Sequence, residues 1–437
     1  MVYPPLRLAS PGSSVLAAPA VPGVAAVVAP YGSGRHYAAE FASRGWKCVA
    51  VTHADDALPP LYRGALDPTG YQRVVVHDGN IHATAHALRS LRVTAVVAGT
   101  EIGVPLAEEL AHRLRLPGND PATSSLRRDK GDMAAALTRA GIAAPRSLST
   151  DRLQDALSWA QSLDTTTGVV LKPADSAGSD GVAFCSSPQD IKAAWEKLHR
   201  VRNVLGGAND HLVVQERLVG SQYVVNTVSA MGPADTARHT VSEVWADRRA
   251  LSSHVYDRLD LLSREKLVPR TLAQYTVRVL DALGIRTGPA HTELMHVPGR
   301  GPVLIESGAR PEGSYDPAAM RQATGSDHIR DAVHAVVTGT PDCLAPDRLR
   351  SCVSKISLIA PHDGALDEDL LHTLLTLPTV RGHVGALVPG IPVRRTVDLL
   401  TSPGRLVLAA RDPHALERDY AAIRDLEAAG LYGEGVR

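Results

Sequence analysis

The stretch that decides the fold of this chain is VVLKPADSAGSDGV, Val169–Val182. Its apolar start predicts a buried strand that delivers Lys172 to a loop of small residues, and the apolar pattern resumes at Val182. A lysine is a compact charge suited to phosphate oxygens. Glycine and serine let backbone N–H groups approach an anion closely. The stretch therefore predicts a clamp for a polyphosphate.

The bulk composition excludes several classes of function. The chain has 437 residues, so we expect two or three domains rather than one core. Its 46 basic and 46 acidic side chains cancel without any block of like charge, which argues against nucleic-acid and membrane partners. The four cysteines form no CxxC pair, so we expect free thiols and no metal cluster. We find no signal peptide and no run of 18 apolar residues, and therefore expect a cytoplasmic protein.

The order of the predicted elements indicates an α/β and α+β multidomain chain. Residues 1–22 are rich in Pro, Ser and Ala, and we expect them to be irregular. Alternating strands and helices over 23–122 predict an open, doubly wound, Rossmann-like sheet. We assign 123–205 to a small lid subdomain with central linker helices, and 206–437 to a large subdomain that includes a C-terminal α+β segment with a strand expected near 385–388.

Two glutamates stand on neighbouring strands of a predicted hairpin. The strands 290–297 and 303–306 are joined by PGRGP, which is strong turn chemistry. If Glu293 and Glu306 pair across this hairpin, both side chains point to one face. Two such carboxylates suit Mg²⁺ that also binds substrate phosphates, and the alternative is a pair of solvated surface glutamates. The apolar neighbours favour metal ligands, because a buried unpaired glutamate is costly.

Arg310 and Lys130 are weaker candidates. Arg310 follows Glu306 by four residues and can reach a phosphoryl group or an oxyanion, or it can form a plain ion pair with Glu306 or Glu312. Lys130 precedes a predicted helix, and a surface position is the simpler interpretation. The motifs GxxxxGK[ST], GxSxG and HExxH are absent from the sequence.

Taken in order, these pieces resemble the ATP-grasp superfamily. The matching residues are Arg128-Asp129-Lys130, Leu171-Lys172-Pro173 with its loop, Val214-Gln215-Glu216 with Gly220, Glu293, and Glu306 to Arg310. Within the superfamily, the wording HTEL at 291–294 and IESGAR at 305–310 resembles the dipeptide-forming L-amino-acid ligases of the bacilysin-synthetase type. AGTE at 98–101 and LPGN at 116–119 resemble the pre-ATP-grasp domain of that group.

The resemblance implies a role for each matching position. Lys130 and Lys172 would hold the ATP phosphates, and residues 176–181 would close over them, including Ser176, Gly178, Ser179 and Gly181. Gln215, Glu216 and Leu218 would line the adenine site, Glu293 and Glu306 would bridge Mg²⁺ (or Mn²⁺), and Arg310 would steady the acyl phosphate. Relatives carry a glutamate for the ribose just after the hinge glycine. Here the candidate is Gln222, whose amide can still bind a hydroxyl.

The implied reaction joins a carboxylate to an amine through an acyl phosphate, with ADP and phosphate released. The substrates would be amino acids or peptides, in a chain that could form a homodimer. Alternatives are an ATP-grasp carboxylase or purine-pathway ligase, and an ATP-binding module without catalysis. Substrate contacts are assigned to His254, His291 and Ser314, and the small Ser314 is expected to leave room for a bulky acyl donor. Trp245, Tyr256 and Tyr315 are also candidates, each with core packing as the simpler interpretation.

Overall fold

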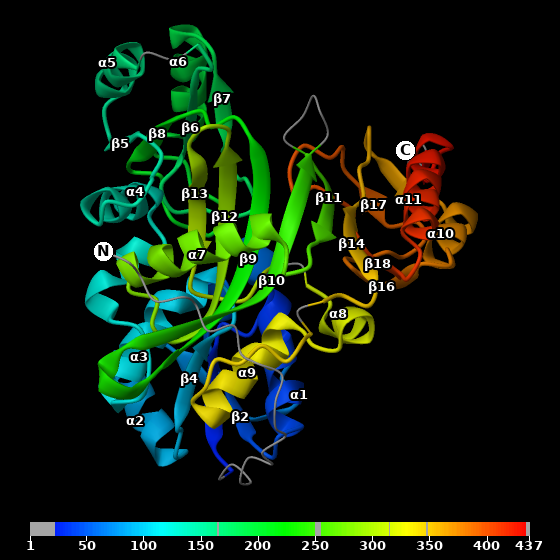
Figure 1. Ribbon diagram of the computed structural model, residues 1–437. Coiled ribbons are helices and arrows are strands. Elements are labelled where there is room, and N and C mark those ends of the chain that lie inside the picture. The colour runs from blue at the N-terminus through cyan, green and yellow to red at the C-terminus, as the bar shows by residue number, and fades with distance from the viewer. Residues whose placement is uncertain (1–21, 164–165, 250–254, 314, 347, 434–437) are drawn as a thin grey trace.

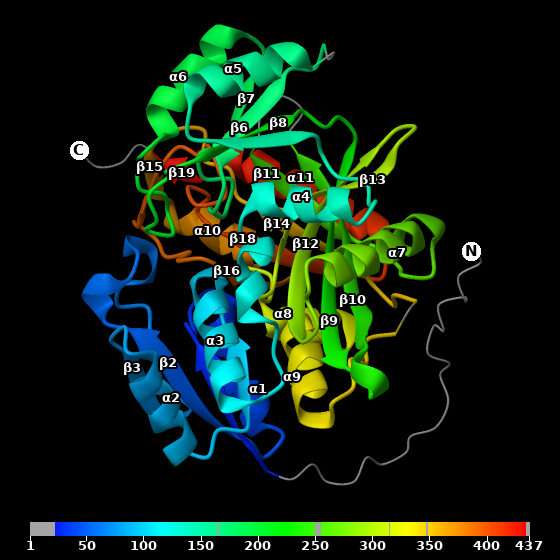
Figure 2. The ribbon, with the colours of Figure 1, turned by 90° about the vertical axis from the view of Figure 1, so that its left-hand side faces the viewer.

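The computed structural model describes residues 22–163, 166–249, 255–313, 315–346 and 348–433. The predicted irregular segment 1–22 lies outside these ranges except for its last residue. Figures 1 and 2 show a central body with the N-terminal domain below it and a small subdomain above it. The C-terminal segment lies beside the central body in Figure 1.

The N-terminal domain is the parallel sheet that the sequence predicts. Its strand order is β3-β2-β1-β4, and β1 pairs in parallel with both β2 and β4. Strand β1 is an unbroken apolar run because both faces of the sheet are covered. The elements are β1 (Val24–Val28), α1 (Tyr37–Ala42), β2 (Lys47–His53), β3 (Tyr71–His77), α2 (Ile81–Ser90), β4 (Ala95–Ala98) and α3 (Val104–Leu114), with 3₁₀ helices at Gly32–His36, Asp55–Ala57, Pro60–Tyr62, Glu101–Gly103 and Pro121–Arg127.

The small subdomain is a four-stranded antiparallel sheet with the order β5-β8-β6-β7. Apolar side chains of α5 and α6 pack on it, and a capping box of Ser187 and Asp190 starts α6. Strand β8 lies between β5 and β6, so this sheet extends beyond the boundary at residue 205 that we predicted for the subdomain. The elements are α4 (Lys130–Arg139), β5 (Ser147–Thr150), α5 (Leu153–Ser162), β6 (Val169–Pro173), β7 (Ala183–Cys185), α6 (Pro188–Leu198) and β8 (Leu212–Glu216).

The large subdomain is built on an eight-stranded sheet with the order β13-β12-β9-β10-β11-β14-β18-β16. It joins the strands within 221–308 to three strands of the C-terminal segment, at 352–357, 380–384 and 405–410, so that part of this segment shares one sheet with the central body. The elements up to residue 338 are β9 (Ser221–Met231), a 3₁₀ helix (Pro233–Asp235), β10 (Ala237–Arg249), β11 (Tyr256–Leu261), α7 (Leu267–Ala282), β12 (Gly288–Val297), β13 (Gly301–Gly308), α8 (Pro317–Thr324) and α9 (His328–Thr338).

The C-terminal segment adds strands and two helices around its own apolar cluster. Its elements are β14 (Cys352–Ser357), β15 (Gly364–Leu366), α10 (Glu368–Leu375), β16 (Val380–Val384), β17 (Pro392–Val393), β18 (Arg405–Ala410), α11 (Pro413–Ala428) and β19 (Tyr432–Gly433). The strand expected near 385–388 was wrong, because β16 ends at Val384 and Gly385 adopts a positive φ of 110°. Among the described residues, no helix is long and apolar enough to cross a membrane.

Candidate active site

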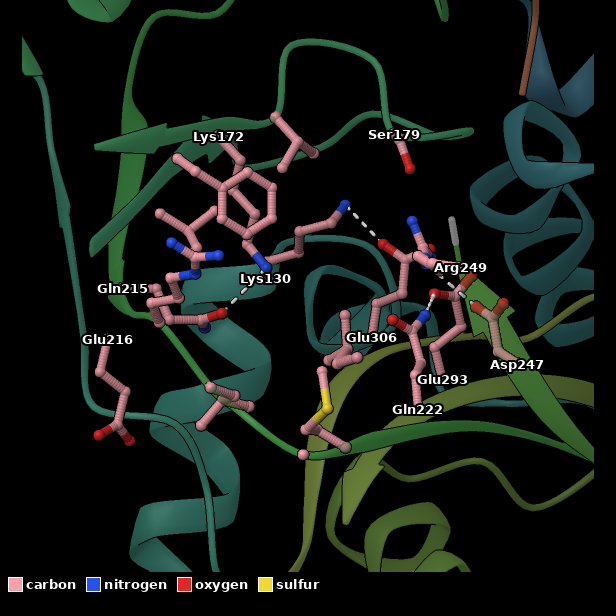
Figure 3. Close-up of a pocket in the computed structure, with 18 of the residues that line it drawn as sticks. Lys130, Lys172, Ser179, Gln215, Glu216, Gln222, Asp247, Arg249, Glu293 and Glu306 are labelled. Carbon is pink, nitrogen blue, oxygen red and sulfur yellow. Dashed lines mark hydrogen bonds and ion pairs between the residues drawn. The ribbon is translucent and has the colours of Figure 1, made fainter. Parts of the chain in front are cut away.

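A cavity of about 630 Å³ opens between the small sheet and the hairpin β12–β13. Figure 3 shows side chains from β6, β8, β9, β10, β12 and β13 converging on it. Ten predicted residues line it, although almost 180 positions of the sequence separate the first from the last: Lys130, Lys172, Ser176, Ser179, Gln215, Glu216, Leu218, Gln222, Glu293 and Glu306.

The two lysines enter this cavity from different elements. Lys172 stands on β6, and its Nζ donates to Gln215 Oε1 at 3.0 Å. Lys130 stands at the start of α4, and its Nζ lies 3.0 Å from Glu306 Oε2 and 2.9 Å from the carbonyl of Ser176. Both are buried, so Lys130 is no surface lysine. The side chain of Asp129 caps α4 and fixes where that helix begins.

Burial affects the two lysines differently. Burial and the charge of Lys130 lower the pKa of Lys172 to about 8. Burial also disfavours the charged form of Lys130, but the carboxylate of Glu306 outweighs it and raises the pKa of Lys130 above its usual value. Both ammonium groups therefore carry charge at neutral pH, and the charge of Lys172 is the one that a moderate rise in pH removes.

The loop after β6 is held in place at both ends. Arg128 forms a bidentate pair with Asp175, at 2.8 and 3.0 Å. Asp180 accepts hydrogen bonds from Ser176 Oγ at 2.7 Å and from the backbone N–H of residue 204 at 3.0 Å. Ser179 has a φ of 64° and lies 3.3 Å from the hydroxyl of Tyr256. These contacts fix a loop whose small residues leave its backbone close to the cavity.

Two loop glycines do not line this cavity. A Cβ on Gly181 would lie within 3.0 Å of Pro173 and Leu198, so this glycine packs inward rather than toward a phosphate. Gly178 faces Leu400 of the C-terminal segment and lines a second cavity instead. The prediction that both glycines contact ATP stays a prediction.

Glu293 and Glu306 face each other across the hairpin. Their Cα atoms are register partners on β12 and β13, next to an irregularity after Glu293, and both side chains line the cavity (Figure 3). Gln222 donates to Glu293 Oε2 at 3.0 Å, and His291 Nε2 lies 3.7 Å from Oε1. Burial alone would raise the pKa of Glu293, but His291 and Arg249 outweigh it and lower the pKa. Glu293 is therefore held in its ionised form, and its carboxylate shares one face of the cavity with that of Glu306.

Asp247 and Arg249 belong to this site and escaped the sequence analysis. Both stand near the end of β10 and point toward Glu293 in Figure 3, 3.2 Å apart from each other. Burial raises the pKa of Asp247 to about 6 although Arg249 opposes it, and Asp247 Oδ1 is a buried oxygen without a hydrogen-bond partner in the described part of the chain. Only their spacing of two along a strand, which puts them on one face, could have indicated them.

The far end of the cavity is less polar. Its apolar lining residues include Val170, Phe184 and Leu218, and the predicted contact of Leu218 with adenine stays a prediction. Glu216 also lines it, but its carboxylate is held by Arg146 at 2.9 Å and by Arg300 at 2.7 Å, which ties β8 to the hairpin turn. Gln222 is placed at Glu293, and its predicted contact with a ribose stays a prediction.

The second cavity, of about 310 Å³, shares Glu293, Glu306, Ala177 and Tyr256 with the first. Arg310 and His291 line it together with residues of the N-terminal domain, among them Gly32 and Glu101. Arg310 Nε donates to Glu101 Oε2 at 2.8 Å, so its ion pair is with neither Glu306 nor Glu312. After Asp247 and Arg249, Glu101 is thus a third residue to which the sequence analysis gave no role in the site.

Of the aromatic candidates, only Tyr256 lines a cavity. Trp245 and Tyr315 are buried core residues that both donate to Glu243, which confirms packing as their role. His254 and Ser314 lie outside the described residues. Among the described residues, no group of three or more His, Cys, Asp or Glu side chains could hold a metal ion.

Comparisons with known proteins agree with this geometry. Residues 165–314 match the model of an ATP-grasp domain. The chain is 29% identical to dapdiamide A synthase from Enterobacter agglomerans over 93% of this chain and 96% of that protein. Its fold is similar to the crystal structure of an L-amino acid ligase from Bacillus licheniformis, with a TM-score of 0.72 and 17% identity over 92% of this chain and 97% of that one. It is also similar to an ADP complex of N5-carboxyaminoimidazole ribonucleotide synthetase, with a TM-score of 0.67 and 12% identity over 94% and 99%.

Proposed function

Since this chain belongs to the ATP-grasp superfamily and is a ligase of the kind that forms carbon–nitrogen bonds, we propose that it joins a carboxylic acid to an amine at the expense of ATP. The proposed product is an amide or peptide bond, made from an amino acid or related acid and the amine of an amino acid or peptide. The observation that supports this most is the junction of two cavities at one pair of carboxylates, Glu293 and Glu306.

The first cavity has the chemistry of an ATP site. Lys130 and Lys172 present two ammonium groups to it, and its apolar lining includes Val170, Phe184 and Leu218. Small residues of the loop after β6, among them Ser176 and Ser179, also belong to the lining. The ammonium groups suit a chain of phosphates, and the apolar side chains suit a flat base. The match to an ATP-grasp domain supports this assignment.

The carboxylates Glu293 and Glu306 fit a divalent cation, Mg²⁺ or Mn²⁺. They are oxygen ligands on one face, and the unpartnered Oδ1 of Asp247 lies near the first of them. Two protein carboxylates leave further positions for phosphate oxygens, which is how Mg²⁺ commonly binds. A cation held there would neutralise charge on the transferred phosphoryl group.

The second cavity would hold the acid. In the proposed reaction, a carboxylate oxygen of the acid attacks the γ-phosphorus, the bond to ADP breaks, and an acyl phosphate forms. The amine nitrogen then attacks the acyl carbon, the bond to phosphate breaks, and the amine loses a proton. Arg310 lines this cavity beside Glu306, where its guanidinium can stabilise the acyl phosphate and the oxyanion that follows. Lysine and arginine contacts supply positioning and charge rather than covalent chemistry.

The test is ADP release with ATP, Mg²⁺ and a panel of amino acids, with hydroxylamine as a general amine and mass spectrometry of the products. An acid-dependent hydroxamate, and an amide when a second amino acid replaces hydroxylamine, support the proposal. Turnover that depends on bicarbonate and gives no hydroxamate would favour a carboxylase-type reaction instead. ATP binding without any turnover would point to a binding module.

A further inference from the structure

The second cavity has a polar end and an apolar end. Its polar end carries His291, Arg310, Glu312 and Arg405 beside the two carboxylates, and its apolar walls come from three parts of the chain: Leu61 and Tyr62, Val204 and Leu205, and Leu399 and Leu400. The charged side chains at the polar end have hydrogen-bond partners among the described residues, with one exception that lies on the first residue of β18.

Arg405 is that exception. It is only 5% exposed, yet its Nε is buried without a hydrogen-bond partner in the described part of the chain. Its nearest carboxylate oxygen is Glu312 Oε1, 3.7 Å from Nη1, which is too far for a hydrogen bond. A guanidinium carries five N–H donors in a rigid fork, and leaving even the one on Nε unmet in a buried place is costly.

Glu312 does not need Arg405 for its own charge. Lys355 Nζ lies 2.8 and 2.9 Å from its two oxygens, and Asn226 donates to Oε2 at 2.7 Å. Lys355 is itself buried against the rings of Trp245 and Tyr315. Lys355 thus already balances the charge of Glu312, so the longer ion pair of Arg405 with the same carboxylate, at 3.7 Å, leaves one positive charge of the three groups without a counter-charge.

The other arginine of the cavity, Arg310, has hydrogen-bond partners within the protein. Arg310 is held by Glu101 at 2.8 Å and donates to the carbonyl of Pro311. Arg405 therefore stands apart as a buried cation of the cavity lining that shares its only carboxylate within 4 Å, among the described residues, with Lys355, and whose Nε has no hydrogen-bond partner there. A buried charged group is normally hydrogen-bonded as well as paired, so the missing acceptor is expected to arrive with a ligand.

We propose that Arg405 binds a substrate carboxylate that is not the carboxylate phosphorylated by ATP. This proposal rests on the proposed function. Two sources share this chemistry: the free α-carboxylate of the amine acceptor, and a second carboxylate on the acyl donor. In either case the guanidinium accepts a planar anion with paired N–H donors. Arg405 would then act as a specificity-determining residue that selects substrates ionised at this position.

The experiment compares acceptors with and without the charge. Each of the twenty L-amino acids and its carboxamide is offered as the amine, and the ratio of kcat/KM between acid and amide is measured for the wild type, Arg405→Met, Arg405→Lys and Arg411→Met. Arg411 is exposed just beyond the same strand and serves as the matched control. We expect the ratio to fall about 10- to 100-fold in Arg405→Met, as for a lost charge-assisted hydrogen bond, less in Arg405→Lys, and not at all in Arg411→Met.

A second arm identifies the source of the carboxylate. With hydroxylamine as the amine, the acyl donor is the only substrate that can bring a carboxylate to Arg405. If Arg405→Met raises the KM for a dicarboxylic donor and leaves the acid-to-carboxamide ratio of kcat/KM for acceptors unchanged, the bound carboxylate belongs to the donor. If both the acceptor ratio and the donor KM match the wild type, the inference is wrong while the ligase proposal stands. Should Arg405→Met not fold, the same comparison is made with Arg405→Lys.

Failure of the proposed function gives a different result. In that case the wild type forms no ADP or hydroxamate with any acid. Calorimetric binding of the same amino acids and carboxamides to the protein without ATP then tests Arg405 alone. Carboxylate binding that is lost in Arg405→Met supports the subsite, and equal binding to both proteins, or none to the wild type, overturns it.

Discussion

Raising the pH from 7 to 9 should weaken nucleotide binding because it removes the charge of Lys172. Burial and the neighbouring Lys130 place the pKa of Lys172 near 8. The protonated fraction of such a group falls from about 0.9 at pH 7 to about 0.09 at pH 9, so the Kd for a nucleotide that needs the charge rises about tenfold. The secondary ionisation of a phosphate lies near pH 6 and contributes little in this range.

The same rise in pH has the opposite effect on folding stability, to which Lys172 contributes more at high pH. The pKa of Lys172 in the folded chain lies below its ordinary value of 10.5, so the unfolded chain binds more protons between pH 8 and 10.5. The contribution of Lys172 to stability therefore improves as the pH rises through that window. A protein that becomes more stable while it binds nucleotide less tightly would be difficult to explain by general damage at alkaline pH.

Calorimetry with a non-hydrolysable ATP analogue at constant ionic strength measures this effect. Lys172→Arg should bind with little dependence on pH, because an arginine keeps its charge. Lys192→Arg, an exposed lysine on α6, is the matched control and should follow the wild type. The reasoning is refuted if the wild type shows no weakening between pH 7 and 9, or if Lys172→Arg weakens as much as the wild type does.

Three further predictions concern the metal, the core and the loop. Glu306→Gln should abolish Mg²⁺-dependent ADP formation while the thermal unfolding temperature stays close to that of the wild type; turnover at the wild-type rate would contradict the metal role. Arg127→Met breaks a fully buried pair with Glu108, with N–O distances of 2.6 and 2.9 Å, and should lower the free energy of unfolding in urea by about 3–5 kcal/mol. The control Arg113→Met removes a surface pair and should lower that free energy by under about 1 kcal/mol. Equal losses in the two variants would contradict the reasoning. Gly178→Ala should lower kcat, because an alanine at a φ of 68° in contact with Leu400 would strain the loop. The control Gly141→Ala, with a φ of 64° and open space around it, should match the wild-type kcat. A similar loss of kcat in both variants would refute a role for the contact with Leu400.

The sequence predicted those parts of the site that come with a local pattern. Lys172 follows an apolar run and precedes small residues, and the spacing of Glu293 and Glu306 around a turn defined a hairpin with both on one face. The N-terminal sheet was equally predictable, because unbroken apolar runs such as that of β1 mark strands buried on both faces.

Residues that act through distant partners could not be predicted in this way. Arg405 opens an ordinary apolar strand, and Asp247 looks like a surface residue of a polar strand end. Their roles depend on their surroundings in three dimensions, since each has a buried polar atom without a hydrogen-bond partner among the described residues. The position of β8 in the small sheet depends likewise on pairing with β5 and β6 rather than on its own sequence.

The walls of the second cavity come from Leu61 and Tyr62, Val204 and Leu205, and Leu399 and Leu400, which belong to segments more than a hundred residues apart. A substrate that fills it would therefore act as a crosslink between the N-terminal domain, the small subdomain and the C-terminal segment. Selectivity for the acid could drift by exchange of side chains in any one of these three segments. The nucleotide cavity, whose walls contain none of them, would be untouched, so this architecture separates the evolution of substrate choice from the conservation of the energy source.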